Sequence, residues 1–158
     1  LNEHFTPLSR VVNEFHGVVD KFVGDLIMAF FGAPKSYGND SANAARCALE
    51  MIQTRRQLNE RSQYRIEIGI GVASGPAVAG NMGSADRLNY TVLGERVNLA
   101  SRLCGQAGRM EVVIDETTQR RLQDAIRVEP MPELLLKGFS ARVTAYKLLD
   151  IQPLPAKL

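Results

Sequence analysis

Two short apolar runs with only two residues between them restrict the fold of this chain more than any other feature. Residues 18–23 and 26–31 are rich in Val, Ile and Phe, and Gly24 and Asp25 separate them. Val, Ile and Phe favour strands, whereas Gly and Asp are common turn residues. The pattern therefore predicts an antiparallel β-hairpin, although the order Gly-Asp is less diagnostic than Asn-Gly.

Apolar periodicity predicts the helices and strands of the remaining chain. Residues 1–15 have near-helical spacing that Pro7 interrupts, so we expect a break between two short helices there. A helix capped by Asp40 or Ser41 is expected to end near Arg61. Residues 65–73 alternate strictly and predict a strand. Further elements are expected as two strands around a Gly-rich turn between residues 75 and 94, a helix over 95–104, a strand over 111–114, a helix from the cap Asp115 to Leu122, and two or three strands over 126–149.

The order of these elements is an α+β pattern with an antiparallel bias. One sheet with helices on a single face would satisfy it. The chain has 158 residues and shows no internal repeat or linker, so we expect a single domain over residues 1–158.

Composition argues against several classes of protein. With 45% hydrophobic and 23% charged residues the chain is typical of a globular domain, and its formal charge of +2 does not favour nucleic acid or a membrane surface as a partner. No apolar run approaches the roughly 18 residues of a spanning helix, and no signal peptide opens the sequence. We therefore expect a cytosolic protein, or the cytosolic part of a larger one. Cys47 and Cys104 lack the spacing of a zinc site, and no disulfide is expected.

Two stretches carry residues that suit chemistry as well as structure. Asp25 follows a strand beside a glycine, where a carboxylate can hold a hard cation such as Mg²⁺, but Gly-Asp also forms an ordinary turn. Asn98 and Arg102 lie four residues apart and so share one face of the helix predicted after Gly94. An amide and a guanidinium near a helix N-terminus suit an anionic ligand, and the same pair is also common on an ordinary helix surface.

The stretches KFVGDLIMAFFGAP, LGERVNLASRL and LKGF, in this order, resemble the catalytic domain of the class III nucleotidyl cyclases. The resemblance covers nearly the whole chain. It implies a ferredoxin-like α+β domain, related to the polymerase palm, with a mostly antiparallel sheet and helices packed on it. It also implies a head-to-tail homodimer whose active sites lie at the interface between the two copies.

The resemblance implies a role for particular residues. Asp25 matches an aspartate that holds metal, with two Mg²⁺ or Mn²⁺ ions in each site of the intact family domain. Lys21 and Thr91 match the pair that reads the purine, and a lysine at that position goes with adenine. Asn98 matches the residue that orients the ribose, and Arg102 matches the one that stabilises the α-phosphate in the transition state.

Lys137, in LKGF, lies near the family's triphosphate-binding lysine. In such a dimer Lys21 and Asp25 of one chain would serve different active sites, the lysine reading a base in one and the aspartate holding metal in the other. The implied reaction is attack of the ribose 3′-hydroxyl of ATP on its own α-phosphate, which gives cyclic AMP and pyrophosphate. The family also implies an upstream sensory or regulatory domain, and the Lys-Thr pair resembles a subgroup that responds to bicarbonate.

Several alternatives stay open at the level of sequence. A guanylyl cyclase is the nearest one, because a threonine hydroxyl both donates and accepts and so discriminates between bases less firmly than an aspartate. Another is a cyclase-homology module without activity, which binds nucleotide or only dimerises. A ferredoxin-like RNA-binding domain would need exposed aromatic residues and a basic sheet face, and the chain has only four Tyr and six Phe.

The chain departs from the family pattern at its start. The family's opening strand and its first metal-binding aspartate, in a segment resembling FxDIxGFT, have no counterpart in this sequence. We therefore expect a domain that lacks the first strand. We also expect this chain to be inactive or weak, because a single carboxylate remains for two cations.

Overall fold

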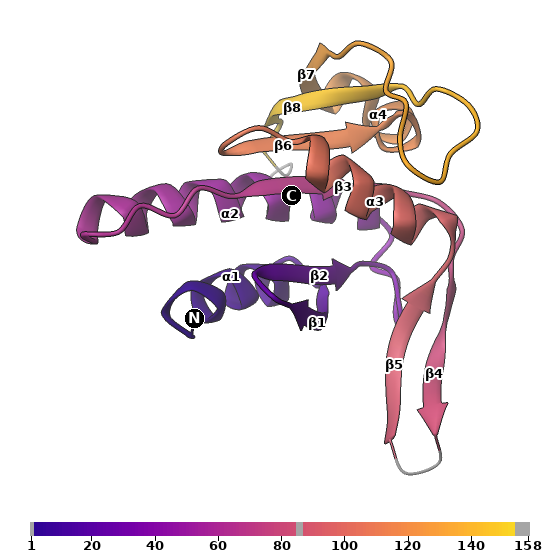
Figure 1. Cartoon of the computed structure of the whole chain (residues 1–158), viewed down its shortest axis with the longest axis horizontal. Coiled ribbons are helices and arrows are strands. Elements are labelled where there is room, and N and C mark those ends of the chain that lie inside the picture. The colour runs from indigo at the N-terminus through magenta and orange to yellow at the C-terminus, as the bar shows by residue number, and fades with distance from the viewer. Residues whose placement is uncertain (1, 85–86, 154–158) are drawn as a thin grey trace, which may run out of the picture.

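The computed structural model describes residues 2–84 and 87–153. Its elements, in chain order, are α1 (Asn2–Glu14), β1 (Val18–Val23), β2 (Leu26–Phe30), α2 (Asp40–Arg61), β3 (Gly69–Val72), β4 (Val78–Ser84), β5 (Arg87–Leu93), α3 (Glu95–Gln106), β6 (Glu111–Asp115), α4 (Glu116–Leu122), the 3₁₀ helix η1 (Gln123–Ala125), β7 (Ile126–Pro130) and β8 (Ala145–Ile151). Figure 1 shows α1 and the β1–β2 hairpin below α2, and strands β6, β7 and β8 above it.

The helices lie close to the predicted ranges, with two corrections. α1 runs through Pro7 without a break, so the expectation of two short helices is wrong. Proline removes only one backbone hydrogen bond, and the buried face that includes Leu8 and Val12 holds the helix together by tertiary packing. α2 begins at Asp40 and ends at Arg61, close to the predicted range, but the expected cap is wrong, because the N-cap is Asn39 and no side chain caps the helix. Asp40 is the first helical residue, and its carboxylate accepts the Tyr37 N–H at 3.0 Å instead. No helix in the described part of the chain is long and apolar enough to cross a membrane.

The strands form three sheets among the described residues, where one sheet was expected. β1 pairs with β2 and β4 pairs with β5, both antiparallel, and the others form a four-stranded sheet in the order β3-β6-β8-β7. This sheet is mixed, because β3 and β6 run parallel while its other neighbours are antiparallel. β3 covers only Gly69–Val72 of the predicted 65–73. The Asn59 side chain donates to the Ile66 carbonyl and accepts from the Ile66 N–H, at 2.9 Å each. Ile66 therefore makes no backbone hydrogen bonds to a neighbouring strand.

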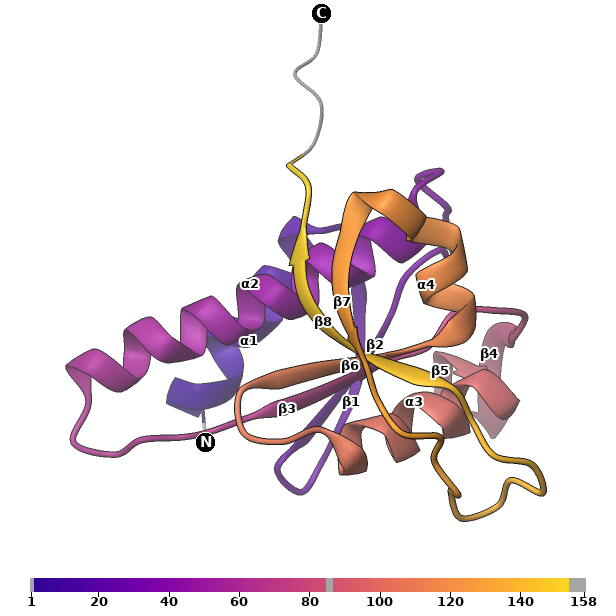
Figure 2. The ribbon, with the colours of Figure 1, turned by 90° about the horizontal axis from the view of Figure 1, so that it is seen from above.

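Helices cover both faces of the four-stranded sheet, which corrects the expectation of a single covered face. Val112 and Ile114 of β6 pack against α2, whereas Val113 between them packs against α3. This alternation follows the two-residue period of a strand. α3 lies so close to β3 that a Cβ on Gly71 would come within 2.3 Å of the Ala100 carbonyl oxygen. Figure 2 shows α2 and α3 on opposite sides of these strands.

The predicted hairpin is present and turns through two residues. Val23 pairs with Leu26, which leaves Gly24 and Asp25 in the loop, and Gly24 has a φ of +61°. Two-residue hairpin turns require a positive φ at the first loop position, which glycine adopts without strain. The second hairpin, β4–β5, extends away from the rest of the molecule (Figure 1). A two-stranded hairpin is at best marginally stable in water on its own.

Candidate active site

α3 presents the predicted amide and guanidinium on its exposed face. Asn98 and Arg102 are both exposed and lie about one helical turn apart. Leu99 and Leu103 of the same helix are buried and pack toward the sheet. Because these leucines fix which side of α3 packs on the sheet, Asn98 and Arg102 stay on the exposed side of the helix.

The loop after β7 brings Lys137 to the same region. Leu136, the residue before it, is buried against α3, and Phe139 packs on the same cluster. The Phe139 N–H donates to the Leu136 carbonyl at 3.1 Å, which closes a tight turn around Lys137. Lys137 itself is exposed. The packing of its neighbours therefore holds it beside the helix that carries Asn98 and Arg102.

The β1–β2 hairpin carries two further predicted residues. Lys21 lies on β1 and Asp25 lies in the turn, and both are exposed. Burial is the main cause that raises the pKa of the Cys104 thiol, and the nearby Asp25 carboxylate raises it further. Cys104 belongs to α3, so the carboxylate at the tip of the hairpin contributes to the electrostatics of that helix.

Thr91 of β5 is joined to the same hairpin through a residue that the sequence did not single out. Its hydroxyl donates a hydrogen bond to the carboxylate of Asp20, the neighbour of Lys21. Tyr90 and Phe30 support this junction, with 5.9 Å between their ring centroids. The two predicted purine-reading residues are therefore linked through one intervening residue. In the sequence, only its position next to Lys21 could have marked Asp20 as a residue of the site.

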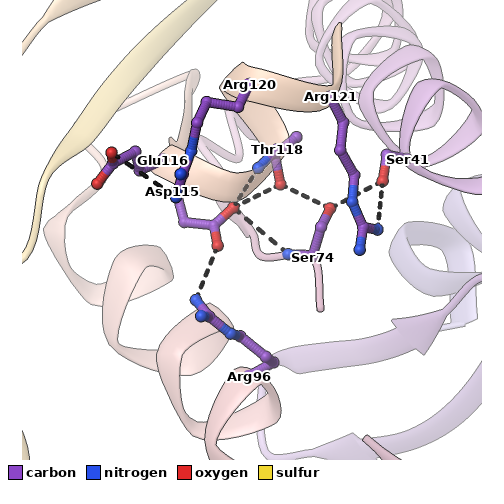
Figure 3. A network of polar contacts seen from close by, with 8 residues as sticks. All are labelled: Ser41, Ser74, Arg96, Asp115, Glu116, Thr118, Arg120 and Arg121. Carbon is purple, nitrogen blue, oxygen red and sulfur yellow. Dashed lines mark hydrogen bonds and ion pairs between the residues drawn. The ribbon is translucent and has the colours of Figure 1, made fainter. Parts of the chain in front are cut away.

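A buried polar network holds the start of α3 (Figure 3). Asp115 is 1% exposed and caps α4 by accepting the Thr118 N–H at 3.0 Å, as predicted. Its other oxygen accepts from Arg96 of α3 at 3.2 Å. The Ser74 hydroxyl bridges those of Thr118 and Ser41, at 2.7 and 3.0 Å, and extends the network to α2. Sequence reasoning missed Arg96 and Ser74, because neither has a partner close by in the chain.

The predicted residues form open groups and not one enclosed site. No hydrogen bond or ion pair within residues 2–84 and 87–153 joins Lys21 or Asp25 to Asn98 or Arg102. A pocket of about 460 Å³ lies between α2 and β8, and another of about 160 Å³ lies beside the buried network, but none of the predicted residues lines either of them.

Asp25 is the residue of these groups that can hold a metal ion. An exposed carboxylate suits Mg²⁺, which takes one or two protein carboxylates and completes its shell with water and phosphate oxygens. In the described part of the chain, no group of three or more His, Cys, Asp or Glu side chains could enclose a metal ion. The described residues therefore offer Asp25 as a single protein ligand to a cation, and they do not form a cage made of protein ligands alone.

Comparison with known families assigns this fold to a class of protein. Residues 1–150 match the family model of the adenylate and guanylate cyclase catalytic domain. The chain belongs to this family, and the resemblance predicted from its sequence is confirmed.

Curated relatives match over part of their length. The uncharacterised protein Rv1319c of Mycobacterium tuberculosis is 42% identical over 104 residues, which cover 66% of this chain and 19% of that protein. Rv1320c of the same organism is 44% identical over 106 residues, which cover 66% of this chain and 18% of that protein. The matched part of the chain thus spans about a fifth of these relatives.

Solved structures confirm the α+β fold. The adenylyl cyclase CyaB from P. aeruginosa has a TM-score of 0.87 at 32% identity, over 96% of this chain and 81% of that one. The guanylyl cyclase Cya2 has a TM-score of 0.92 at 31% identity, over 100% of this chain and 82% of that one. Because the two are almost equally similar to this chain, overall similarity does not decide between ATP and GTP.

Proposed function

We propose that this chain is the catalytic domain of an adenylyl cyclase, which converts ATP to 3′,5′-cyclic AMP and pyrophosphate at sites shared by two copies. The observation that carries the proposal is the exposed pair Asn98 and Arg102, which buried packing holds on α3, with no hydrogen bond or ion pair among the described residues to the equally exposed Asp25. Neither group encloses a substrate within one chain. In a two-fold dimer, each copy supplies the half that the other lacks.

The β4–β5 hairpin supports such an assembly. It projects from the body of the domain (Figure 1), and Val78 and Leu93, which pair at its base, are 65% and 52% exposed. A projecting hairpin with exposed apolar side chains becomes more stable when another surface covers it. We expect a homodimer in which this hairpin contacts the second copy.

The chemistry of each residue suits its role in an in-line displacement. Arg102 presents a planar fork of N–H donors, which stabilises charge on the α-phosphate as the 3′-oxygen attacks and the bond to the β-phosphate oxygen breaks. Asn98 both donates and accepts, so it orients the ribose. Lys137 places positive charge beside the triphosphate. Asp25 would hold the divalent cation, Mg²⁺ or Mn²⁺, which supplies charge neutralisation at the phosphates.

Preference for ATP over GTP rests first on Lys21. An ammonium group only donates hydrogen bonds. It therefore fits N1 of adenine, which accepts, and not N1 of guanine, which carries a hydrogen. We expect Lys21→Glu, combined with a change at Thr91, to shift the preference toward GTP.

The test is an assay of cyclic AMP formation with Mg²⁺ and with Mn²⁺, on the full-length protein beside this chain alone. We expect turnover of ATP by the full-length protein, and loss of turnover in Asp25→Ala with an unchanged dimer in sedimentation. Asp124→Ala, which removes an exposed carboxylate on η1, is the matched control and should stay active.

Other outcomes would point elsewhere. Normal cyclic AMP formation by Asp25→Ala would remove Asp25 from the site. Faster turnover of GTP than of ATP would make the protein a guanylyl cyclase. Binding of nucleotide without any turnover in the full-length protein would favour a regulatory cyclase-homology module.

A further inference from the structure

Asp20 occupies an irregular position in β1. Its two neighbours in the chain pair with consecutive residues of β2, so Asp20 has no partner across the hairpin and forms a β-bulge. Bulges change the direction in which a side chain points. Here the Asp20 carboxylate accepts the hydrogen bond from the Thr91 hydroxyl on β5, and this bond joins two separate sheets.

This hydrogen bond restricts what else Thr91 can do. A hydroxyl carries one hydrogen and two lone pairs, whereas an ionised carboxylate only accepts. The hydrogen of Thr91 is therefore committed to Asp20, and only lone pairs remain for a ligand. Thr91 is 9% exposed and Asp20 is partly buried. At such a site an unpaired polar group is costly, which keeps the bond in place.

The two purines differ in what they offer to such an acceptor. Adenine presents an amino donor at position 6 beside the N1 acceptor, whereas guanine presents a carbonyl acceptor at position 6 beside an N1–H donor. Lys21 only donates, and Thr91 bonded to Asp20 only accepts. This pair matches adenine at both positions and guanine at neither.

We propose that Asp20 is a positioning residue that makes Thr91 an obligate acceptor and thereby gives the purine site its preference for adenine. The inference rests on the proposed function, in which Lys21 and Thr91 contact the base. It also resolves an ambiguity of the sequence, because a threonine hydroxyl alone both donates and accepts. Asp20 itself acts only through Thr91.

The experiment compares ATP and GTP as substrates of the full-length protein and its Asp20→Asn variant. Asparagine keeps the shape of aspartate, but its NH₂ group can donate to Thr91 and so frees the Thr91 hydrogen for the carbonyl of guanine. We expect the ratio of kcat/KM for ATP to that for GTP to fall about tenfold, the effect of one mismatched hydrogen bond. If Asp20 only supported the fold, both values would fall together and their ratio would not change.

A second background shows whether the effect passes through Thr91. Thr91→Val removes the hydroxyl, so adding Asp20→Asn to it should leave the ratio unchanged. A ratio that Asp20→Asn does not alter in the wild-type background would overturn the inference. So would an equal fall in the ratio with and without the Thr91 hydroxyl.

Displacement of a fluorescent ATP analogue by ATP and by GTP, on the same proteins, makes the outcome independent of turnover. If the wild type binds ATP more tightly than GTP but forms no cyclic nucleotide, the proposed catalytic function fails, and the ratio of the two Kd values tests Asp20 in the same way. Tighter binding of GTP than of ATP, or binding of neither, would overturn the inference itself.

Discussion

Replacing Asp115 with alanine tests the buried network that anchors α3. The carboxylate accepts from the Thr118 N–H at 3.0 Å, from the Ser74 N–H at 3.4 Å and from Arg96 at 3.2 Å. Asp115 is 1% exposed, so water cannot readily replace the lost oxygens. Alanine therefore leaves these donors without their acceptor and removes the cap of α4.

The magnitude follows from these contacts. Loss of an N-cap costs about 1 kcal/mol, and a buried donor left unpaired costs about 1–3 kcal/mol. The ion pair adds no more than about 1 kcal/mol, because the Arg96 side chain is 34% exposed and solvent screens it. We expect the free energy of unfolding to fall by about 4 kcal/mol. For a domain of this size that lowers the melting temperature by about 12 °C.

Urea and thermal unfolding followed by circular dichroism measure this loss. Asp115→Asn is the matched control, because asparagine keeps an acceptor for the Thr118 N–H but turns an NH₂ group toward Arg96. We expect it to lose only about 1–2 kcal/mol. A loss below about 1 kcal/mol in Asp115→Ala, within the range of an ordinary substitution, would refute the view that this network supports α3.

Three further predictions concern packing, titration and assembly. Gly71→Ala should lower the free energy of unfolding in urea by about 3 kcal/mol, because the new Cβ would meet backbone atoms of α3 at 2.3–2.4 Å. Gly80→Ala is the control and should be tolerated, because a Cβ there has nothing within 4 Å. Equal losses in the two variants would contradict the close approach of α3. Burial raises the pKa of the Cys47 thiol from 9.0 to about 12, so the stability it contributes is fully present below pH 9 and is lost as pH rises toward 12. The stability difference between wild type and Cys47→Ala should therefore shrink by about 1.4 kcal/mol from pH 8 to pH 10 in urea titrations, and a constant difference would show that the thiol is not buried in this way. Co-expressed Asp25→Ala and Arg102→Ala chains should regain about a quarter of wild-type cyclic AMP formation although each alone is inactive, because half of the dimers are mixed and hold one intact site; no recovery would argue against shared sites.

Several elements were predictable because their causes lie within a few residues of the chain. Two apolar runs around Gly24 and Asp25 produce the β1–β2 hairpin, and an aspartate directly before a helical segment produces the cap at Asp115. The spacing of Asn98 and Arg102 places both on one face of α3, and the structure shows that face exposed.

The corrections arise where a distant part of the molecule overrides a local signal. Tertiary packing of α1 outweighs the hydrogen bond that Pro7 removes. The alternation of residues 65–73 indicates a strand, but only Gly69–Val72 finds a partner in β6, and the Asn59 side chain takes up the backbone of Ile66. The periodicity of a segment shows which of its faces is apolar. It does not show which strand or helix that face will pack against.

By itself the sequence determined most of the helices and strands to within a few residues, the α+β class and the family, because these depend on periodicity, capping and motifs read along the chain. Only the tertiary structure decided that helices cover both faces of the four-stranded sheet, that the polar residues lie in open groups, and that Thr91 donates to Asp20. The physical reason is distance along the chain. Asp20 and Thr91 are 71 residues apart, and a hydrogen bond between them exists only because a bulge and two packed hairpins bring them together.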